Sequence, residues 1–166
     1  HSKRTIYKDL KTTTNMSLHI AHVNICGIYS ETTGTSNFDA LIGLMIQEDI
    51  AVCSISEHNI STTSMKPEHM FYNWEGSHRD SSRGGSGLLI NKYLQHRDIS
   101  TRFKTTAEFT AVEFSWRKET YLIVSVYLPQ HNNSSEMDAN DSLFQQINNQ
   151  SDNWDNIIIL GDFNAW

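Results

Sequence analysis

NIIILGDFN, residues 156–164, joins a continuous apolar run to a short polar turn. The run 156–160 is rich in β-branched Ile, which favours a strand of a sheet that is covered on both faces. Gly161, Asp162 and Asn164 follow directly. Because ligands of open α/β sheets bind at the carboxyl ends of the strands, this stretch predicts a buried strand with part of a functional site at its end.

Two earlier segments show the same order of an apolar run and a polar residue. The first, 18–25, reads LHIAHVNI and carries Asn24 near its end; the second, 50–56, reads IAVCSIS and is followed by Glu57. Parallel strands end at the same edge of a sheet. We therefore expect Asn24, Glu57 and Asp162 to line one cleft.

The segment between these two strands has the pattern of a helix. Ser36 is followed three residues later by Asp39, which predicts a capped helix start. A strand, a helix and a strand in this order favour parallel pairing through a right-handed crossover, so the sequence predicts an α/β fold. Apolar residues recur at the spacing of one helical face: Phe38, Leu41, Ile42, Met45 and Ile46.

The rest of the chain predicts further strands and one more helix. Two runs of β-forming residues joined by 116–118 indicate an antiparallel hairpin, and Leu143, Phe144 and Ile147 lie at helical spacing. The expected elements are short strands at 71–74 and 88–90 around a Gly/Ser-rich loop at 76–87, hairpin strands at 110–115 and 119–127, and a helix at 135–150.

The charge of the chain excludes one kind of nucleic-acid binding. The 166 residues carry 13 Lys and Arg against 19 Asp and Glu, and no Lys or Arg follows residue 131. Non-specific DNA binding depends on clustered cations that displace counterions. A polyanionic substrate would therefore need a local basic patch or metal ions. Carboxylate and amide oxygens at the predicted cleft suit Mg²⁺ or Mn²⁺.

Composition also bounds the organisation of the chain. Residues 1–17 are polar and lack apolar periodicity, so we expect a flexible leader and then one domain over 18–166. No apolar run approaches the length of a membrane span, and no secretory signal can be read. Cys26 and Cys53 lie in apolar surroundings, which favours buried, reduced thiols in an intracellular protein with no membrane partner.

Five motifs occur in a characteristic order: VNICGI at 23–28, SISEHNI at 54–60, RGGSGLLI at 83–90, VSVYLPQ at 124–130 and IIILGDFNAW at 157–166. This set resembles the endonuclease/exonuclease/phosphatase superfamily, and within it the apurinic-type endonuclease domain that precedes reverse transcriptase in LINE-like, non-LTR retrotransposons. The resemblance covers 18–166. It implies a DNase I-like sandwich of two sheets flanked by helices, of which this chain is the N-terminal portion, incomplete at its C-terminus.

The resemblance implies a role for each polar residue of the predicted cleft. By position in the motifs, Glu57 matches a metal ligand and Asn24 matches an Asn at the metal and phosphate site. Asp162 matches the Asp that orients or deprotonates the attacking water. Tyr127 and Asn164 match residues that contact the scissile phosphate. The implied reaction is Mg²⁺-dependent hydrolysis of a DNA phosphodiester, which leaves 3′-hydroxyl and 5′-phosphate ends.

The same resemblance implies substrate contacts and partners. Independently of the resemblance, the charges of the Gly/Ser-rich loop make His78, Arg79 and Arg83 the best basic patch for DNA phosphates, although charges in such loops are equally often only solvated. Gln130 stands where the family's motif carries Asn, and it keeps the amide chemistry of a substrate contact. The implied partners are DNA, a divalent metal and a reverse transcriptase domain in the parent chain. The implied location of the parent protein is the nucleus.

Two other interpretations stay open. A phosphatase or phosphodiesterase of the same superfamily would act on lipid or nucleotide phosphates. A catalytically inactive relic would keep the scaffold and only bind DNA or protein. The relic is favoured by Cys26, where repair enzymes of the superfamily carry Asp, by Gln130, and by the absence of the family's Ser-Asp-His motif from this sequence. Outside the motif context, Tyr127 would be a packing residue of a strand and Asn24 a turn cap.

Overall fold

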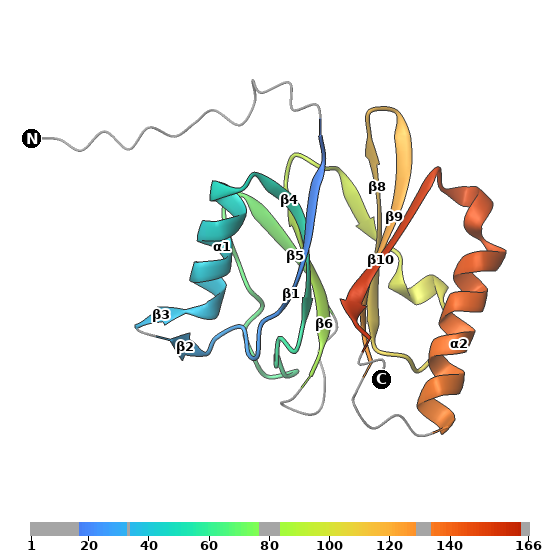
Figure 1. Cartoon of the computed structure of the whole chain (residues 1–166), viewed down its shortest axis with the longest axis horizontal. Helices are drawn as coiled ribbons and strands as arrows, with labels where there is room; N and C mark the ends of the chain where they lie inside the picture. Colours follow the sequence, from blue (N-terminus) through green and yellow to red (C-terminus); the bar gives the residue numbers. More distant parts are fainter. Residues whose placement is uncertain (1–16, 33, 77–83, 129–133, 164–166) are drawn as a thin grey trace, which may run out of the picture.

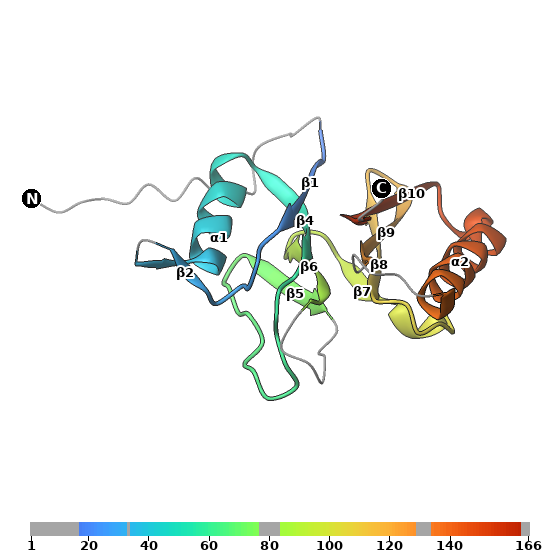
Figure 2. The same cartoon turned by 60° about the horizontal axis from the view of Figure 1, so that its bottom comes forward.

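Two four-stranded sheets pack face to face in the computed structural model, which describes residues 17–32, 34–76, 84–128 and 134–163 (Figure 1). One helix lies outside each sheet: α1 (Asn37–Gln47) covers the first, and α2 (Ser134–Asn149) covers the second. The view in Figure 2 shows the same layers, helix, sheet, sheet and helix. The predicted two-sheet α/β sandwich is confirmed.

The first sheet has the strand order β1-β4-β6-β5. β1 and β4 are parallel, with Asn24 opposite Ser56, and α1 lies between them in the sequence. The parallel pairing expected from the strand, helix and strand order is confirmed. The strands are β1 (His19–Asn24), β4 (Ile50–Ser56), β5 (Tyr72–Gly76) and β6 (Ser86–Asn91), and a small separate hairpin joins β2 (Glu31–Thr32) to β3 (Thr35–Ser36).

The second sheet has the strand order β10-β9-β8-β7. β8 and β9 form the predicted hairpin, and its turn residues Arg117 and Lys118 have φ values of 52° and 69°. Two successive positive φ values match a hairpin turn to the twist of its strands. β9 and β10 are parallel, with Tyr127 opposite Asp162. The elements are β7 (His96–Asp98), η1 (Ser100–Arg102), β8 (Phe109–Trp116), β9 (Glu119–Tyr127), η2 (Ser151–Asn153) and β10 (Asn156–Asp162).

α1 begins at the predicted cap. The Ser36 hydroxyl accepts a hydrogen bond from the Asp39 backbone N–H at 3.1 Å and donates to the Asp39 carboxylate at 2.7 Å. Ile46 departs from the expected apolar face: it is 48% exposed, because it lies beyond the edge of the stripe that contacts the sheet. The buried face consists of Phe38, Leu41, Ile42 and Met45.

Three hydrophobic clusters hold the layers together. One joins α1 to the first sheet, one joins α2 to the second sheet, and the third fills the space between the sheets. Removal of this apolar surface from water is the main force that keeps the sheets in contact. Five side chains of the central cluster have no exposed surface: Val52, Leu88, Ile90, Val112 and Ile123.

β10 is less covered than its apolar sequence predicts. We expected a strand buried on both faces, but all residues from Ile157 to Leu160 are only partly buried. The reason is position: among the described residues, β10 pairs only with β9 and forms the edge of its sheet, next to the edge strand β1 of the other sheet. The strand lies where expected, and the prediction of full burial is wrong.

The two cysteines lie in different surroundings. Both are free thiols, but only Cys53 is buried, and burial raises its pKa to about 12. Cys26 is exposed because it lies in the turn after β1 and not within the strand. The expectation of two buried thiols is therefore wrong for Cys26.

Four remaining expectations concern the leader, the Gly/Ser-rich loop, the strand at 71–74 and a membrane span. Of the expected leader and the Gly/Ser-rich loop, residues 1–16 and 77–83 lie outside the described residues. The strand expected at 71–74 spans Tyr72–Gly76. Within the described part of the chain, no helix has the length and hydropathy needed to cross a membrane.

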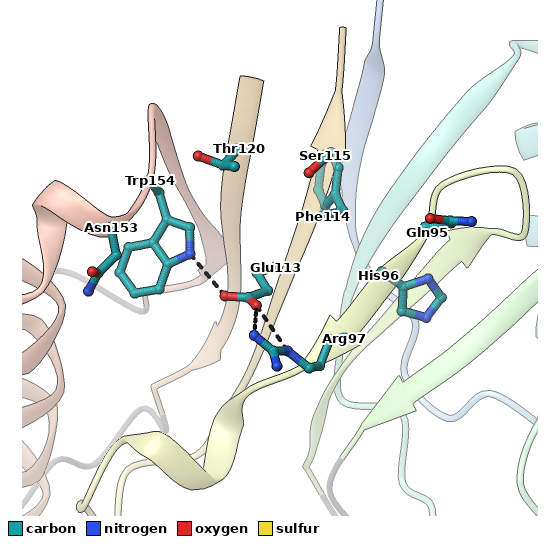
Figure 3. Close-up of a pocket in the computed structure, with 9 residues that line it drawn as sticks. All are labelled: Gln95, His96, Arg97, Glu113, Phe114, Ser115, Thr120, Asn153 and Trp154. Atoms are coloured by element: carbon teal, nitrogen blue, oxygen red, sulfur yellow. Dashed lines mark hydrogen bonds and ion pairs between the residues drawn. The ribbon is translucent and has the colours of Figure 1, made fainter. Parts of the chain in front are cut away.

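The carboxylate of Glu113 in β8 links β7 to the segment that precedes β10. The Glu113 carboxylate of β8 accepts hydrogen bonds from Arg97 Nε at 2.9 Å and from Trp154 Nε1 at 3.2 Å (Figure 3). Partial burial raises the pKa of Glu113, but these bonds and the charges of Arg102 and Arg97 lower it below its usual value overall. Glu113 lines a pocket of about 360 Å³, and its negative charge there is already compensated by Arg97 of the neighbouring strand.

Gly161 marks the closest approach of β10 to β9. A Cβ at this position would lie 1.9 Å from the Val126 backbone oxygen, so one strand must shift to admit alanine. We expect Gly161→Ala to lower the free energy of unfolding by about 1 to 3 kcal/mol, as overpacking does elsewhere. Urea unfolding followed by circular dichroism measures this change.

Gly43→Ala is the matched control for this substitution. Gly43 lies in α1 and has nothing within 4 Å of its Cβ position. Alanine there should raise the free energy of unfolding by up to about 1 kcal/mol through helix propensity. Equal stability of the Gly161→Ala variant and the unaltered protein would contradict the close approach of the two strands.

Candidate active site

The amide of Asn24 bridges the two carboxylates that the sequence predicts to lie together. Its Nδ2 donates to Glu57 Oε1 at 3.0 Å and to Asp162 Oδ2 at 3.2 Å. Asn24 ends β1, Glu57 directly follows β4, and Asp162 ends β10. These residues, up to 138 positions apart in the sequence, form one group that we name the Asn24 cluster.

The Asn24 cluster lies where the two sheets meet. Asn24 and Glu57 belong to the first sheet and Asp162 to the second, and the edge strands β1 and β10 lie side by side (Figure 1). Because both strands end at this edge, their last residues meet although they belong to different sheets. All three side chains are at least partly exposed, so solvent reaches them.

The charge of the cluster suits a cation. Two carboxylates within hydrogen-bonding distance of one amide repel each other, and a positive ion between them would relieve this repulsion. Over the described ranges, no group of three or more His, Cys, Asp or Glu side chains is arranged to hold a metal. The oxygen ligands at the cluster are the carboxylates of Glu57 and Asp162, because Asn24 presents its N–H groups to them. Mg²⁺ is often held by one or two carboxylates together with water and phosphate oxygens. The residues fit such an ion.

The turn after β1 orients the Asn24 amide. Its Oδ1 accepts hydrogen bonds from the Cys26 backbone N–H at 3.2 Å and from the Cys26 thiol at 3.4 Å, while Nδ2 faces the carboxylates. Cys26 has a φ of 49°, in the left-handed region that non-glycine residues seldom occupy. The next residue, Gly27, donates to the Glu57 carbonyl at 2.8 Å. This turn therefore holds both Asn24 and the loop of Glu57.

The loop that carries Glu57 is held in a disfavoured conformation by the start of β6. Glu57 and Asn59 have φ values of 55° and 56°. The Glu57 N–H donates to Gly85 O at 2.9 Å, and Asn59 exchanges two hydrogen bonds with Gly84, one of them from Gly84 N–H to Asn59 Oδ1 at 2.7 Å. Such strain persists only where the surroundings enforce it, and it is common at functional sites. Asn59 and this glycine pair lie in the motifs SISEHNI and RGGSGLLI, but the sequence alone indicated no role for them in holding the loop.

His58, next to Glu57 in the sequence, lies inside the protein. It is 1% exposed, and its Nδ1 accepts the Ile60 N–H at 2.9 Å. Its ring meets Trp74 edge to face at 5.2 Å. A Cβ at Gly85 would lie 2.3 Å from this ring, so the absence of a side chain there makes room for His58. His58 thus supports the Glu57 loop from within.

Tyr127 lies at the same strand end as Asp162. The two residues are opposite each other in the parallel pair of β9 and β10, and the Leu128 N–H donates to Asp162 O at 2.9 Å. Tyr127 is half-buried and lines a cavity of about 130 Å³ together with Glu108 and the first turns of α2. The structure therefore brings Tyr127 to this end of the second sheet.

His22 lies behind the cluster on β1. Burial lowers its pKa, while the negative charge of Asp162 and a hydrogen bond with Ser54 act in the opposite direction. His22 Nδ1 and Ser54 Oγ are 3.0 Å apart. His22 therefore pairs with a buried hydroxyl of the neighbouring strand β4.

Four predicted site residues cannot be placed. Asn164, Arg79, Arg83 and Gln130 lie outside the described residues, so their roles stay predictions. Of the predicted site residues, the structure brings Asn24, Glu57 and Asp162 into direct contact.

Solved structures share this fold, whereas no protein-family model and no curated protein sequence matches the chain. The endonuclease domain of TRAS1, a telomere-specific non-LTR retrotransposon, matches 90% of this chain and 60% of its own, at a TM-score of 0.66 and 11% identity. The 3′ phosphatase NExo from Neisseria matches 90% of this chain and 58% of its own, at a TM-score of 0.65 and 9% identity. The human Nocturnin catalytic domain matches 90% of this chain and 64% of its own, at a TM-score of 0.63 and 14% identity.

The chain has the fold of the endonuclease/exonuclease/phosphatase superfamily. A protein described by that family name, from Leptotrichia buccalis, matches at a TM-score of 0.59 over 90% of this chain. The fold expected from the five sequence motifs is confirmed. The chain spans 60% of the length of the TRAS1 domain and 64% of the Nocturnin domain.

Asn59 offers a test of the strained loop. Asn59→Gly removes the hydrogen bond to the Gly84 N–H but relieves the positive φ, whereas Asn59→Ala removes the same bond and keeps the strain. We expect the alanine variant to be less stable than the glycine variant by about 1 kcal/mol, the usual cost of a left-handed alanine. Urea unfolding of both variants measures the difference. Equal stability would show that the loop relaxes to another conformation.

Proposed function

We propose that this protein hydrolyses phosphodiester bonds in DNA with the help of a divalent cation, as a nicking endonuclease. The observation that carries the proposal is the Asn24 cluster, in which one amide holds Glu57 and Asp162 together at the ends of strands from two sheets. Phosphoryl transfer needs compensation of negative charge and alignment of the attacking water.

The residues divide this work between them. We infer that Glu57 would hold Mg²⁺ or Mn²⁺, and that Asn24 would join it as a ligand once its amide rotates so that Oδ1, which now accepts from Cys26, faces Glu57. The ion would compensate the charge of the scissile phosphate. Asp162, at the end of the neighbouring sheet, accepts a hydrogen bond from the attacking water and so aligns it with the phosphorus. Tyr127 and Asn164 contact the phosphate oxygens.

Two of the matching structures support DNA as the substrate. NExo was solved with a product DNA hairpin, and Danio rerio TDP2, which matches at a TM-score of 0.57 and 13% identity, was solved with a single-stranded DNA product. The net charge of this chain is −6, so a general electrostatic attraction for DNA is weak. We infer that the cation and the predicted contacts of Arg79, Arg83 and Gln130 supply the attraction.

The finer assignment concerns the biological setting. The motif resemblance and the match with the TRAS1 domain favour a nuclease of a non-LTR retrotransposon. We therefore propose a nuclear protein that nicks DNA to prime a reverse transcriptase domain of the same parent chain.

A phosphatase is the second candidate, because NExo, a 3′ phosphatase, matches this chain nearly as well as the TRAS1 endonuclease domain does. Both activities need the same cation and the same aligned water. The nuclease attacks a phosphate that joins two nucleotides, whereas the phosphatase attacks a phosphate at the end of a DNA strand.

Relaxation of supercoiled plasmid in Mg²⁺ tests the nuclease. The complete protein should convert supercoiled DNA to nicked circles, and Asp162→Ala should lower the rate by about a hundredfold or more, since the water loses its acceptor. Asp141→Ala, at an exposed position of α2, should leave the rate unchanged.

The same assay separates the alternatives. Phosphate release from 3′-phosphorylated oligonucleotides without plasmid nicking would replace the nuclease by the phosphatase. Absence of both reactions in Mg²⁺ and Mn²⁺ would leave a DNA- or protein-binding relic.

Cation binding can be measured without catalysis. Titration calorimetry with Mn²⁺ should show one site, and Glu57→Gln should weaken binding by about tenfold or more, since it removes the charged ligand of the ion. Asp141→Asn is the control, because it changes the net charge equally but lies on α2. A similar loss of affinity in the control would mean that Mn²⁺ responds only to total charge.

A further inference from the structure

A chain of hydrogen bonds joins the two sheets behind the Asn24 cluster. His22 Nδ1 lies 3.0 Å from Ser54 Oγ, and Ser54 Oγ lies 2.8 Å from Ser125 Oγ. His22 is on β1, Ser54 on β4 and Ser125 on β9. The two serines have no exposed surface, so this contact crosses the closed interior between the sheets.

A second hydrogen bond crosses the same space. Thr110 of β8, which is 2% exposed, donates its hydroxyl to the Ser86 carbonyl of β6 at 3.0 Å. Thr110 is opposite Ser125 in the second sheet. The two contacts are therefore neighbours. We name His22, Ser54, Ser125, Thr110 and Ser86 the hydroxyl seam, to which Ser86 contributes its backbone carbonyl and not its hydroxyl.

The hydroxyl seam lies directly behind the residues of the site. His22 precedes Asn24 by two residues on β1, and Ser125 precedes Tyr127 by two residues on β9. Ser125 is also opposite Leu160, two residues before Asp162. Because side chains two apart in a strand point to the same face, the seam is the layer next to the site on each sheet.

Hydrogen bonds are a costly way to fill this space. The rest of the gap between the sheets is filled by apolar side chains, both aliphatic ones such as Val112 and Ile123 and the rings of Phe114 and Tyr121. Buried hydroxyls lose their water and repay this cost only when they are paired at the right distance and angle. Aliphatic contacts tolerate small shifts of one sheet against the other, whereas a hydroxyl pair penalises them. The seam therefore fixes the spacing of the sheets at this level.

We propose that the hydroxyl seam sets the separation of the two sheets at the site, so that one Asn24 amide reaches both Glu57 and Asp162. The seam residues are positioning residues, because they act through the spacing of β1, β4 and β9. The proposal rests on the proposed function for its effect on catalysis. Its geometric part concerns only the Asn24 cluster.

Paired alanine substitutions separate positioning from stability. Ser54→Ala or Ser125→Ala alone leaves one buried hydroxyl without its partner in the other sheet, and should lower the urea midpoint. The double variant removes both hydroxyls and should recover much of the midpoint, since replacing both partners by apolar groups is nearly neutral. The remaining cost is that of His22 Nδ1, which loses its contact with Ser54. If the seam positions the site, the double variant recovers much of its stability but not the geometry of the cluster.

The Asn24 side-chain amide reports this geometry directly. Its two N–H groups are held by different carboxylates, so their ¹H and ¹⁵N chemical shifts depend on both contacts. We expect these signals, assigned by their loss in Asn24→Asp, to shift in Ser54→Ala/Ser125→Ala and in Thr110→Val. Mn²⁺ affinity should fall by about tenfold, as it does when residues that orient a metal ligand are changed.

Ile123→Val is the matched control. It lies two residues before Ser125 on β9, in the aliphatic part of the same interface. It should lower the urea midpoint and leave both the Asn24 signals and the Mn²⁺ affinity unchanged. Unchanged Asn24 signals in the double variant, or equal shifts in Ile123→Val, would overturn the proposal. If the unaltered protein binds no Mn²⁺, the proposed function fails while the amide signals still decide the role of the seam.

Discussion

One amide group, that of Asn24, holds two negatively charged side chains from different sheets within hydrogen-bonding distance. The surrounding structure keeps this contact in place. Cys26 turns the amide toward the carboxylates, the start of β6 holds the Glu57 loop in a left-handed conformation, and Gly161 lets β10 lie against β9. Each feature carries a local cost, which suggests that the folded state is stabilised elsewhere so that this arrangement can be kept.

Much of the architecture follows from local and periodic signals. Some elements depend only on residues that are close in the sequence, so the sequence alone can predict them. These are the strand at 50–56, the Ser36 cap and the hairpin around Arg117 and Lys118. The meeting of Asn24 with Glu57 was also predictable, because the parallel strands β1 and β4 end at the same edge of one sheet. Asp162 was expected at the same place, but this rule does not explain its position, because β10 belongs to the other sheet and reaches Asn24 through the packing of the two sheets.

Other features depend on tertiary contacts that no local pattern encodes. An Ile-rich strand reads the same at the edge of a sheet as in its middle, so the partial exposure of β10 could not be predicted. The sequence around a serine in a strand does not indicate whether its hydroxyl bonds to another sheet, so the contact between Ser54 and Ser125 could not be predicted. The inward position of His58 depends on the space left by Gly85, a residue on a different strand.

The edge positions of β1 and β10 have a thermodynamic consequence. Within the described structure, each has one neighbouring strand in its sheet, whereas β4 and β9 have two. Amide hydrogen exchange in edge strands commonly proceeds through local fraying, at a smaller free energy than global denaturation. Excursions in which the last residues of β10 detach would separate Asp162 from Asn24 while the sandwich stays intact. The lifetime of the assembled acid pair is then governed by these small openings, and a bound cation or polyanion that bridges both strands would lengthen it.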